Sequence, residues 1–241
     1  MLQLCLVELR LLLRRRITAF SVVVVPVGLA ALVLFGDRPG GTAEWGRLLS
    51  TNVSLLMMMS VFLVSVTVFT SRRQSRVLKR LRTTELSDTA VLGGVLLPVV
   101  AVGLVQAVAF LVFCFATGAP APGDPAAVVV GVLLSVAVAT AAGVATACLS
   151  RSVEATQVTG TPVLLAAVAS AFLTSSNEPA VAALGLAMPI AGPADLVARG
   201  WSAGATVGDV PVLPLDLASA VLWLAVAGFV FHRSFRWEPR A

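Results

Sequence analysis

Long apolar stretches dominate the chain, and short polar segments separate them. A helix that crosses about 30 Å of hydrocarbon needs about 20 predominantly apolar residues. Six stretches come close to this length or exceed it, so we predict an all-α membrane protein with six transmembrane helices. They form a single transmembrane domain, residues 1–241, and residues 36–52 are predicted to be a polar loop. The predicted spans are residues 17–35, 53–70, 89–116, 126–149, 158–174 and 215–231.

Two segments depart from the spanning pattern. Residues 2–16 place three leucines on one helical stripe beside Arg10 and Arg14, which is typical of an amphipathic helix that lies in the membrane interface. Residues 175–212 are interrupted by several prolines and glycines, and no piece is long enough to cross the bilayer cleanly. We expect short interfacial helices or a re-entrant hairpin in this second segment.

Composition and charge support this topology. Of the 241 residues, 58% are hydrophobic and 12% are charged, and the mean hydropathy is +0.97, whereas soluble domains carry about 25% charged residues. Fourteen of the seventeen Lys and Arg residues lie on one side of the predicted topology, and Arg38, Arg47 and Arg199 lie on the other. Positive charge marks the cytoplasmic side, so we predict a multi-pass protein of the cell membrane with both termini cytoplasmic. Basic residues at span ends indicate a lipid bilayer rather than nucleic acid as partner.

Residues that carry common enzyme and transport chemistry are missing from the sequence. A Walker A loop ends in Gly-Lys-Ser/Thr, but the single lysine, Lys79, follows Leu78. His232 is the single histidine and no two cysteines are closely spaced, so we predict no catalytic residue, no metal site and no bound cofactor. No span interior carries an ionisable group, and we expect Asp216 to be an interfacial group at the outer edge of the last span. This pattern disfavours ion-coupled transport and indicates a membrane body that another protein drives.

The segment between the second and third spans is the most basic part of the chain. Residues 72–82 hold six of the seventeen basic groups. As a helix, the segment places Val77, Leu78 and Leu81 on one apolar stripe, with the basic side chains on the remaining arc. Two interpretations follow: a solvated loop that orients the protein and touches anionic lipid, or a short helix on the cytoplasmic face that a partner protein grips.

The same segment carries a resemblance to a known family. Residues 72–87, RRQSRVLKRLRTTELS, resemble the loop of ABC-2 type transporter permeases of the bacterial drug- and antibiotic-export type. In that family charged residues and a Leu-Lys-Arg-Leu-Arg core precede Thr-Pro-Leu/Val-Ser, and Glu85 stands here in the place of the proline. Residues 188–199, MPIAGPADLVAR, are similar to the family's segment before the last span, where an arginine follows a proline by some ten residues.

The resemblance implies six helices per subunit, paired permease subunits (two copies, or one copy and a related subunit), and a separate ABC ATPase on the cytoplasmic face that binds the ATP. It further implies that residues 72–88 form the cytoplasmic coupling helix and that residues 175–212 form short extracellular re-entrant helices. The residues of the basic segment that would couple to the ATPase are Arg76, Val77, Leu78, Arg80, Leu81 and Arg82.

Five other residues are candidates for a functional role. Arg151 and Glu154 lie three residues apart in a short link and either pair with each other or form a second contact with the ATPase. Gln106, in the middle of the third span, either bonds to a neighbouring helix or contacts substrate. Met58 either packs against other helices or faces lipid, or it lines the substrate path. Pro189 belongs either to an irregular cap or to an extracellular gate on that path.

The sequence thus favours the membrane-spanning permease subunit of an ATP-driven exporter, not itself an enzyme. Uncharged spans favour a hydrophobic or amphipathic small-molecule substrate, such as a drug, an antibiotic or a lipid. Two alternatives remain: a membrane scaffold or assembly protein without transport, and a secondary transporter or channel.

Overall fold

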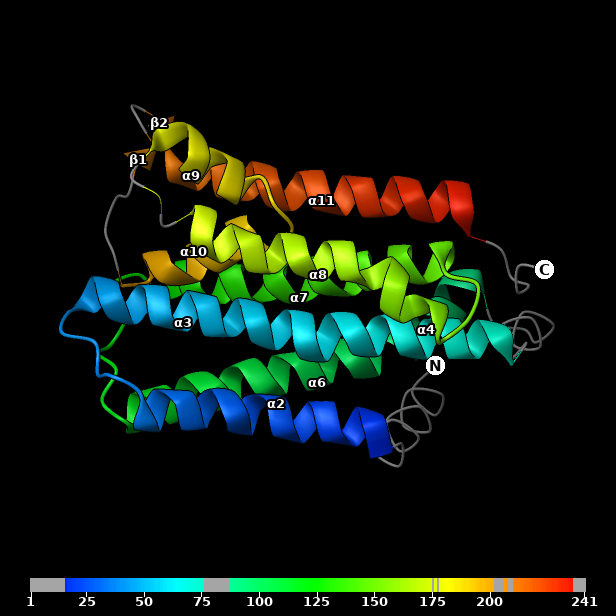
Figure 1. Ribbon diagram of the computed structural model, residues 1–241, viewed down its shortest axis with the longest axis horizontal. Helices are drawn as coiled ribbons and strands as arrows, with labels where there is room; N and C mark the ends of the chain where they lie inside the picture. Colours follow the sequence, from blue (N-terminus) through cyan, green and yellow to red (C-terminus); the bar gives the residue numbers. More distant parts are fainter. Residues whose placement is uncertain are drawn as a thin grey trace.

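The protein is a bundle of long helices that run along one axis (Figure 1). The computed structural model describes residues 16–75, 87–174, 176, 178–201, 206–207 and 210–235. Two predicted elements lie largely outside the described residues: the N-terminal amphipathic helix, residues 2–16, of which only Arg16 is described, and the coupling helix, residues 72–88, of which residues 76–86 are not described. The helices are α2 (Arg16–Phe35), α3 (Thr42–Leu56), η1 (Met57–Phe62), α4 (Leu63–Gln74), α6 (Asp88–Ala116), α7 (Pro125–Leu149), α8 (Ala155–Leu173), α9 (Pro179–Leu186), α10 (Ala191–Arg199) and α11 (Val212–Ser234).

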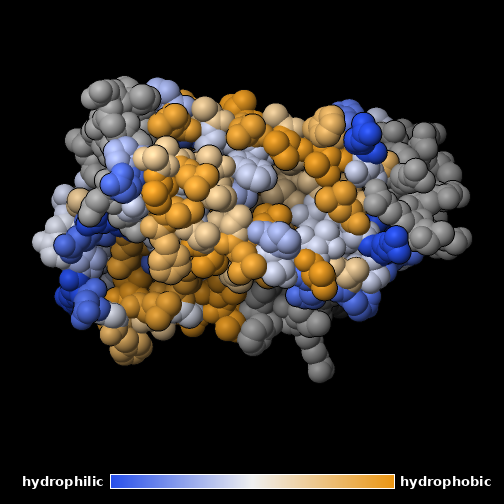
Figure 2. Space-filling model, turned by 45° about the horizontal axis from the view of Figure 1, so that its top comes forward, coloured by the Kyte–Doolittle hydropathy of each residue, from blue (hydrophilic) through white to orange (hydrophobic). Residues whose placement is uncertain are grey.

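The prediction of an all-helical membrane protein is confirmed. Five described helices are long and apolar enough to cross a membrane, or six if α9 and α10 together form one broken span, and α2 adds a shorter apolar stretch, Val22–Phe35. The strands among the described residues are an antiparallel pair of two residues each, β1 (Thr206–Val207) and β2 (Val210–Pro211). Hydrophobic side chains fill the middle of the face in Figure 2, and hydrophilic ones gather at its two ends. This distribution is the one expected for a body that spans a bilayer.

Five helices coincide with predicted spans to within three residues at either end, namely α2, α6, α7, α8 and α11. The second predicted span, residues 53–70, is too short, because α3, η1 and α4 form one rod of 33 residues, Thr42–Gln74. Residues 42–52, about two thirds of the predicted loop over residues 36–52, are therefore helical. The first part of this rod is amphipathic rather than uniformly apolar, and it buries one stripe of side chains every three to four residues, which a search for continuous apolar runs overlooks. The buried stripe is Trp45, Leu49, Val53 and Leu56.

The centre of the bundle is α7, which packs against α4, η1, α10 and α11. It is built mainly of Val, Ala and Gly, and such small residues let membrane helices approach closely. A Cβ on Gly143 would lie 2.9 Å from the Phe62 carbonyl oxygen, and one on Gly131 would lie 2.8 Å from the Pro193 carbonyl oxygen. The two glycines therefore set the contact of α7 with the α3–α4 rod and with α10.

The two ends of the bundle differ in charge. The end at which α4 and α11 finish carries Arg72, Arg73, His232 and Arg233 in the last helical turns, and we call it the basic end. It lies on the right in Figure 1. The opposite end, at which α3, α7 and α11 begin, is called the distal end. It also holds α9 and α10, which meet at 108°.

Candidate functional site

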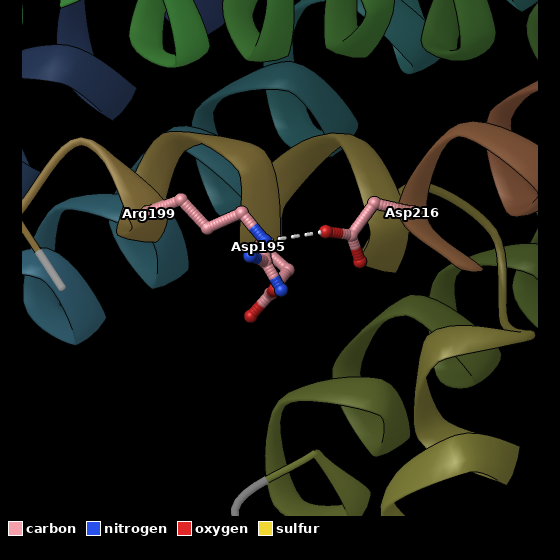
Figure 3. A network of polar contacts seen from close by, with 3 residues as sticks. All are labelled: Asp195, Arg199 and Asp216. Carbon is pink, nitrogen blue, oxygen red and sulfur yellow. Dashed lines mark hydrogen bonds and ion pairs between the residues drawn. The ribbon is translucent and has the colours of Figure 1, made fainter. Parts of the chain in front are cut away.

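Three charged side chains form a network, with one member fully buried and two partly exposed, where α10 meets α11 (Figure 3). Asp195 and Arg199 lie one turn apart on α10, and Asp216 lies near the start of α11. Arg199 Nε donates to Asp216 Oδ2 at 2.8 Å and lies 3.4 Å from Asp195 Oδ2. The Asp216 side chain is 0% exposed and that of Arg199 is 12% exposed. The sequence predicts Asp216 to be an interfacial group at the outer edge of the last span, and it does lie near the start of α11. The structure adds that its carboxylate is enclosed by protein and ion-paired.

The backbone around this network brings α10 unusually close to α11. A Cβ on Gly192 would lie 2.5 Å from the Asp216 carbonyl oxygen, so only glycine fits here without a shift of one helix. Ile190, directly before α10, has φ 67°, a left-handed conformation that is a genuine outlier for a β-branched residue. The surrounding packing holds it there, since Ile190 is fully buried. This strained turn, with buried Pro189 before it, produces the bend between α9 and α10.

The network holds two carboxylates for one guanidinium. Asp216 Oδ1 is buried and has no hydrogen-bond partner among the described residues. A small polar pocket of about 40 Å³ lies beside Asp195, large enough for one ordered water molecule. Hydroxyl groups from two other helices line it, those of Ser50, Thr51 and Ser54 on α3 and those of Ser170 and Thr174, at the end of α8. The distal end therefore contains a partly open polar centre where α3, α8, α10 and α11 come together.

A second polar contact lies deeper in the bundle and involves Gln106. Its Nε2 donates to the Val22 carbonyl oxygen at 2.6 Å, and its Oε1 accepts from Ser60 Oγ at 2.7 Å. Pro26 has no N–H, so it leaves the carbonyl four residues earlier, that of Val22, without its helical partner. Gln106 supplies the missing donor and joins α2, η1 and α6. Of the two roles predicted for Gln106, the structure shows the bond to neighbouring helices.

The other two predicted substrate-path residues lie in separate elements. Met58 is 2% exposed and lies within η1, which is a π-helical segment. Such segments are rare in proteins overall, and those that occur often lie at functional sites. Ser60, two residues on, bonds Gln106, so the structure brings Gln106 to the π-helix that contains Met58. Pro189 lies in the buried turn between α9 and α10 instead, and the structure does not bring it to this group.

At the basic end, Arg73 joins α4 to the end of α7. Its guanidinium donates to the Cys148 carbonyl oxygen at 3.4 Å and to the Ser150 carbonyl oxygen at 2.5 Å, and the residue is 1% exposed. The last carbonyls of a helix lack intrahelical donors and carry partial negative charge, so a cation is favoured there. In the sequence Arg73 counts as one charge of the basic segment. In the structure Arg73 is a buried link between two spans.

The predicted ATPase-coupling residues at this end fall into two groups. Arg76, Val77, Leu78, Arg80, Leu81 and Arg82 lie outside the described residues. Arg151 and Glu154 are both exposed in the link between α7 and α8, and no ion pair joins them in this described link. Hydrogen bonds from the Glu154 backbone and the Ser152 hydroxyl hold the pKa of the Glu154 carboxyl below its ordinary value. An ionised, exposed carboxylate is thus available to a partner at this position.

An open apolar groove of about 520 Å³ runs between α6, α7 and α11 in the basic half of the bundle. Sequence reasoning missed this groove, the charged network and the role of Arg73. The sequence held two signals for the network. Asp195 and Arg199 carry opposite charges four residues apart, and Asp216 is an ionisable residue close to an apolar span. The groove has no comparable signal, because three helices far apart in the sequence form it.

The geometry defines a polytopic helical membrane protein with polar contacts buried between its spans and with no cluster of metal-ligating residues in the described parts of the chain. The chain belongs to the ABC-2 family of transporters: the family model described as ABC-2 family transporter protein matches residues 18–231. Searches of curated proteins and of solved structures find no match. Members of this family are membrane components of ABC transporters, not themselves catalytic, and they normally work with an ABC ATPase subunit. The predicted ABC-2 type permease is thereby confirmed.

Proposed function

We propose that this permease subunit exports a hydrophobic or amphipathic small molecule and that a separate ATPase subunit drives it from the basic end. The match to the ABC-2 family over residues 18–231 carries the proposal. The apolar groove among α6, α7 and α11 supports the substrate class. A second permease subunit, either another copy or a related chain, completes the transport path.

The proposal places the basic end in the cytoplasm of the cell, with both termini on that side of the cell membrane. Arg72, Arg73, Arg151 and Arg233 lie at this end among the described residues. Lys and Arg accumulate in cytoplasmic segments of membrane proteins. At the distal end, α9 and α10 would then form the re-entrant pair on the extracellular side.

Force from the ATPase would enter through the segment between α4 and α6. Val77, Leu78 and Leu81 provide an apolar stripe for the partner, and Arg76, Arg80 and Arg82 provide charge. Both flanks of the segment continue directly into long helices. Arg73 ties the end of α4 to α7, and the Ser87 hydroxyl accepts a hydrogen bond from the Ala90 N–H at the start of α6. A displacement of the segment would therefore move α4 and α6 rather than a slack loop.

Co-purification with the ATPase tests the proposal. Val77→Asp and Leu81→Asp each put a charge on the predicted stripe, and we expect loss of the complex and of substrate-stimulated ATPase activity in reconstituted membranes. Thr83→Asp is the matched control, because it adds the same charge on the opposite side of the predicted helix. If both stripe variants keep the complex and its stimulated activity, the coupling assignment is wrong. If the wild-type complex moves only a small inorganic ion, the substrate class is wrong.

A further inference from the structure

The small polar pocket beside Asp195, which we call the hydroxyl pocket, lies next to an unbalanced charge. Asp195 is the one charged residue among its described lining residues. Its Oδ2 lies 3.4 Å from Arg199 Nε, but the same Nε donates to Asp216 Oδ2 at 2.8 Å (Figure 3). Two carboxylates therefore share one guanidinium. With both of them ionised the group lacks one positive charge, and the partly exposed Asp195 side chain lines the pocket from which a ligand can supply it.

Three hydroxyl groups of the pocket have already used their protons. Ser50, Ser170 and Thr174 each donate to a carbonyl oxygen of the preceding turn in their own helix, at 3.0, 2.7 and 2.8 Å. A hydroxyl has one proton and two acceptor sites, so in this arrangement these three oxygens can only accept a hydrogen bond from a ligand. Thr51 and Ser54 add two further hydroxyls to the lining. The pocket therefore presents mainly oxygen acceptors around one carboxylate.

The backbone around the pocket also favours a cation. The N–H groups of Ala191 and Ala194, which line it on the side of α10, donate to the carbonyl oxygens of Met188 and Ile190. Those two amides are therefore not available to an anion. On the other side, α8 ends at Leu173 and its last turn lines the pocket. The C-terminus of a helix carries partial negative charge, which stabilises a cation placed beside it.

We propose that the hydroxyl pocket binds a primary ammonium group. Its positive charge balances the second carboxylate, and its three N–H donors bond Asp195 and the acceptor hydroxyls of α3 and α8. The pocket holds about 40 Å³, more than the 10–15 Å³ that a group of the size of water needs, and its open side leaves room for the rest of the ligand. The ammonium group belongs to an amphipathic small molecule or to the ethanolamine headgroup of a lipid. The site is a binding site in its own right and does not depend on the proposed coupling to an ATPase.

Thermal unfolding of the full-length protein in detergent, with methylammonium chloride as the probe, tests the proposal. Tetramethylammonium chloride is the matched control, because it carries the same charge but no N–H donor. At about ten times its half-saturating concentration, methylammonium should raise the Tm by about 3–6 °C, whereas tetramethylammonium should not. Equal shifts with the two ions would overturn the proposal, and so would the absence of any shift, since a proton would then balance the second carboxylate. A sodium chloride titration that matches methylammonium would overturn the assignment of an ammonium group.

Two variants locate the binding in the pocket. Asp195→Asn keeps the side-chain size, removes the charge and should abolish the shift, whereas Asp37→Asn removes an exposed carboxylate at the same end outside the pocket and should keep it. Thr174→Val keeps the side-chain shape and should weaken methylammonium about fivefold through loss of one hydrogen bond. Its matched control is Thr161→Val, which removes the same kind of bond within α8, from Thr161 Oγ1 to the Gln157 carbonyl oxygen, and should bind as wild type.

A shift that persists in Asp195→Asn overturns the site, and Thr174→Val gives an independent result if the first variant does not fold. Two further pairs of probes separate the sources of the ammonium group: octylammonium against octyltrimethylammonium, and phosphatidylethanolamine against phosphatidylcholine with the same acyl chains. Stabilisation by the primary amine in the first pair alone assigns an amphipathic small molecule, and in the second pair alone a lipid headgroup. No ATPase is present in these experiments, so failure here and failure of the proposed function are separate observations.

Discussion

Substitution of Arg199 by alanine should be the most damaging change in the charged network of α10 and α11. The variant leaves Asp216, whose side chain is 0% exposed, without the guanidinium that now lies 2.8 Å from its Oδ2. Removal of one partner from a buried ion pair costs about 3–5 kcal/mol, because the remaining charge is enclosed and uncompensated. Asp195 loses its contact at the same time.

The two aspartates should follow in a definite order. Asp216→Ala leaves Arg199 its contact with Asp195 at 3.4 Å, so we expect a smaller cost of about 2 kcal/mol. Asp195→Ala leaves the shorter bond between Arg199 and Asp216 in place, and the Asp195 side chain is 28% exposed, so about 1 kcal/mol is expected. The predicted order of destabilisation is Arg199→Ala, then Asp216→Ala, then Asp195→Ala.

Thermal unfolding in detergent, followed with a dye that fluoresces on reaction with thiols, measures this order. Cys114 and Cys148 are buried thiols outside any disulfide, and they react once the bundle opens. A Cys5→Ser background removes the remaining cysteine. A cost of 1 kcal/mol lowers the Tm of a chain of this size by about 2–4 °C, so Arg199→Ala should lower it by about 6–20 °C.

Arg47→Ala is the matched control, because Arg47 is an exposed arginine near the start of α3, at the same end of the bundle. Its Tm should stay within about 2 °C of the parent, as expected for a surface substitution. An Arg199→Ala variant that melts within the same 2 °C would refute the reasoning. An Asp195→Ala variant that melts below both others would refute the assigned order of contacts.

Three other substitutions have expected outcomes in the same melting assay. Gln106→Leu removes two hydrogen bonds and should cost about 1–2 kcal/mol. Pro26→Ala in that background restores an N–H to the carbonyl of Val22 and should recover part of the lost stability. If the effects of the two substitutions simply add, the pairing of Gln106 with this carbonyl is contradicted. Arg73→Met should lower the Tm by about 4–12 °C, and an unchanged Tm would show that the end of α7 does not need the guanidinium. Gly131→Ala should destabilise because its Cβ would meet α10 backbone atoms, and Gly28→Ala, with open space around it, should not.

The helices were largely predictable because continuous apolar runs leave few alternatives in a bilayer. The full length of the rod from Thr42 to Gln74 was not predictable in this way. Glu44 and Arg47 on its solvent side interrupt the apolar run, while Leu49 and Val53 on the other side are fully buried. Average hydropathy over a window cannot separate two faces of one helix. A search for period 3.6 over residues 42–56 would have found it.

The polar contacts were only partly predictable, because most of their partners lie far apart in the sequence. Pro26 signals a free carbonyl and Gln106 signals a buried donor, but nothing in the sequence pairs them. The pairing depends on α2 lying beside α6, which the fold decides. Arg73 is similar: a basic residue at the end of a span is typical of orientation signals, and only the position of Cys148 and Ser150 beside it gives it a structural role.

The helix α7 connects the two ends of the molecule. At the basic end its last carbonyls accept hydrogen bonds from Arg73 of α4. Near its start, Gly131 packs directly on the backbone of α10, the helix that carries Asp195 and Arg199. Close-packed helices move as units rather than bend continuously. The proposed displacement of α4 by an ATPase would therefore reach the charged network through α7.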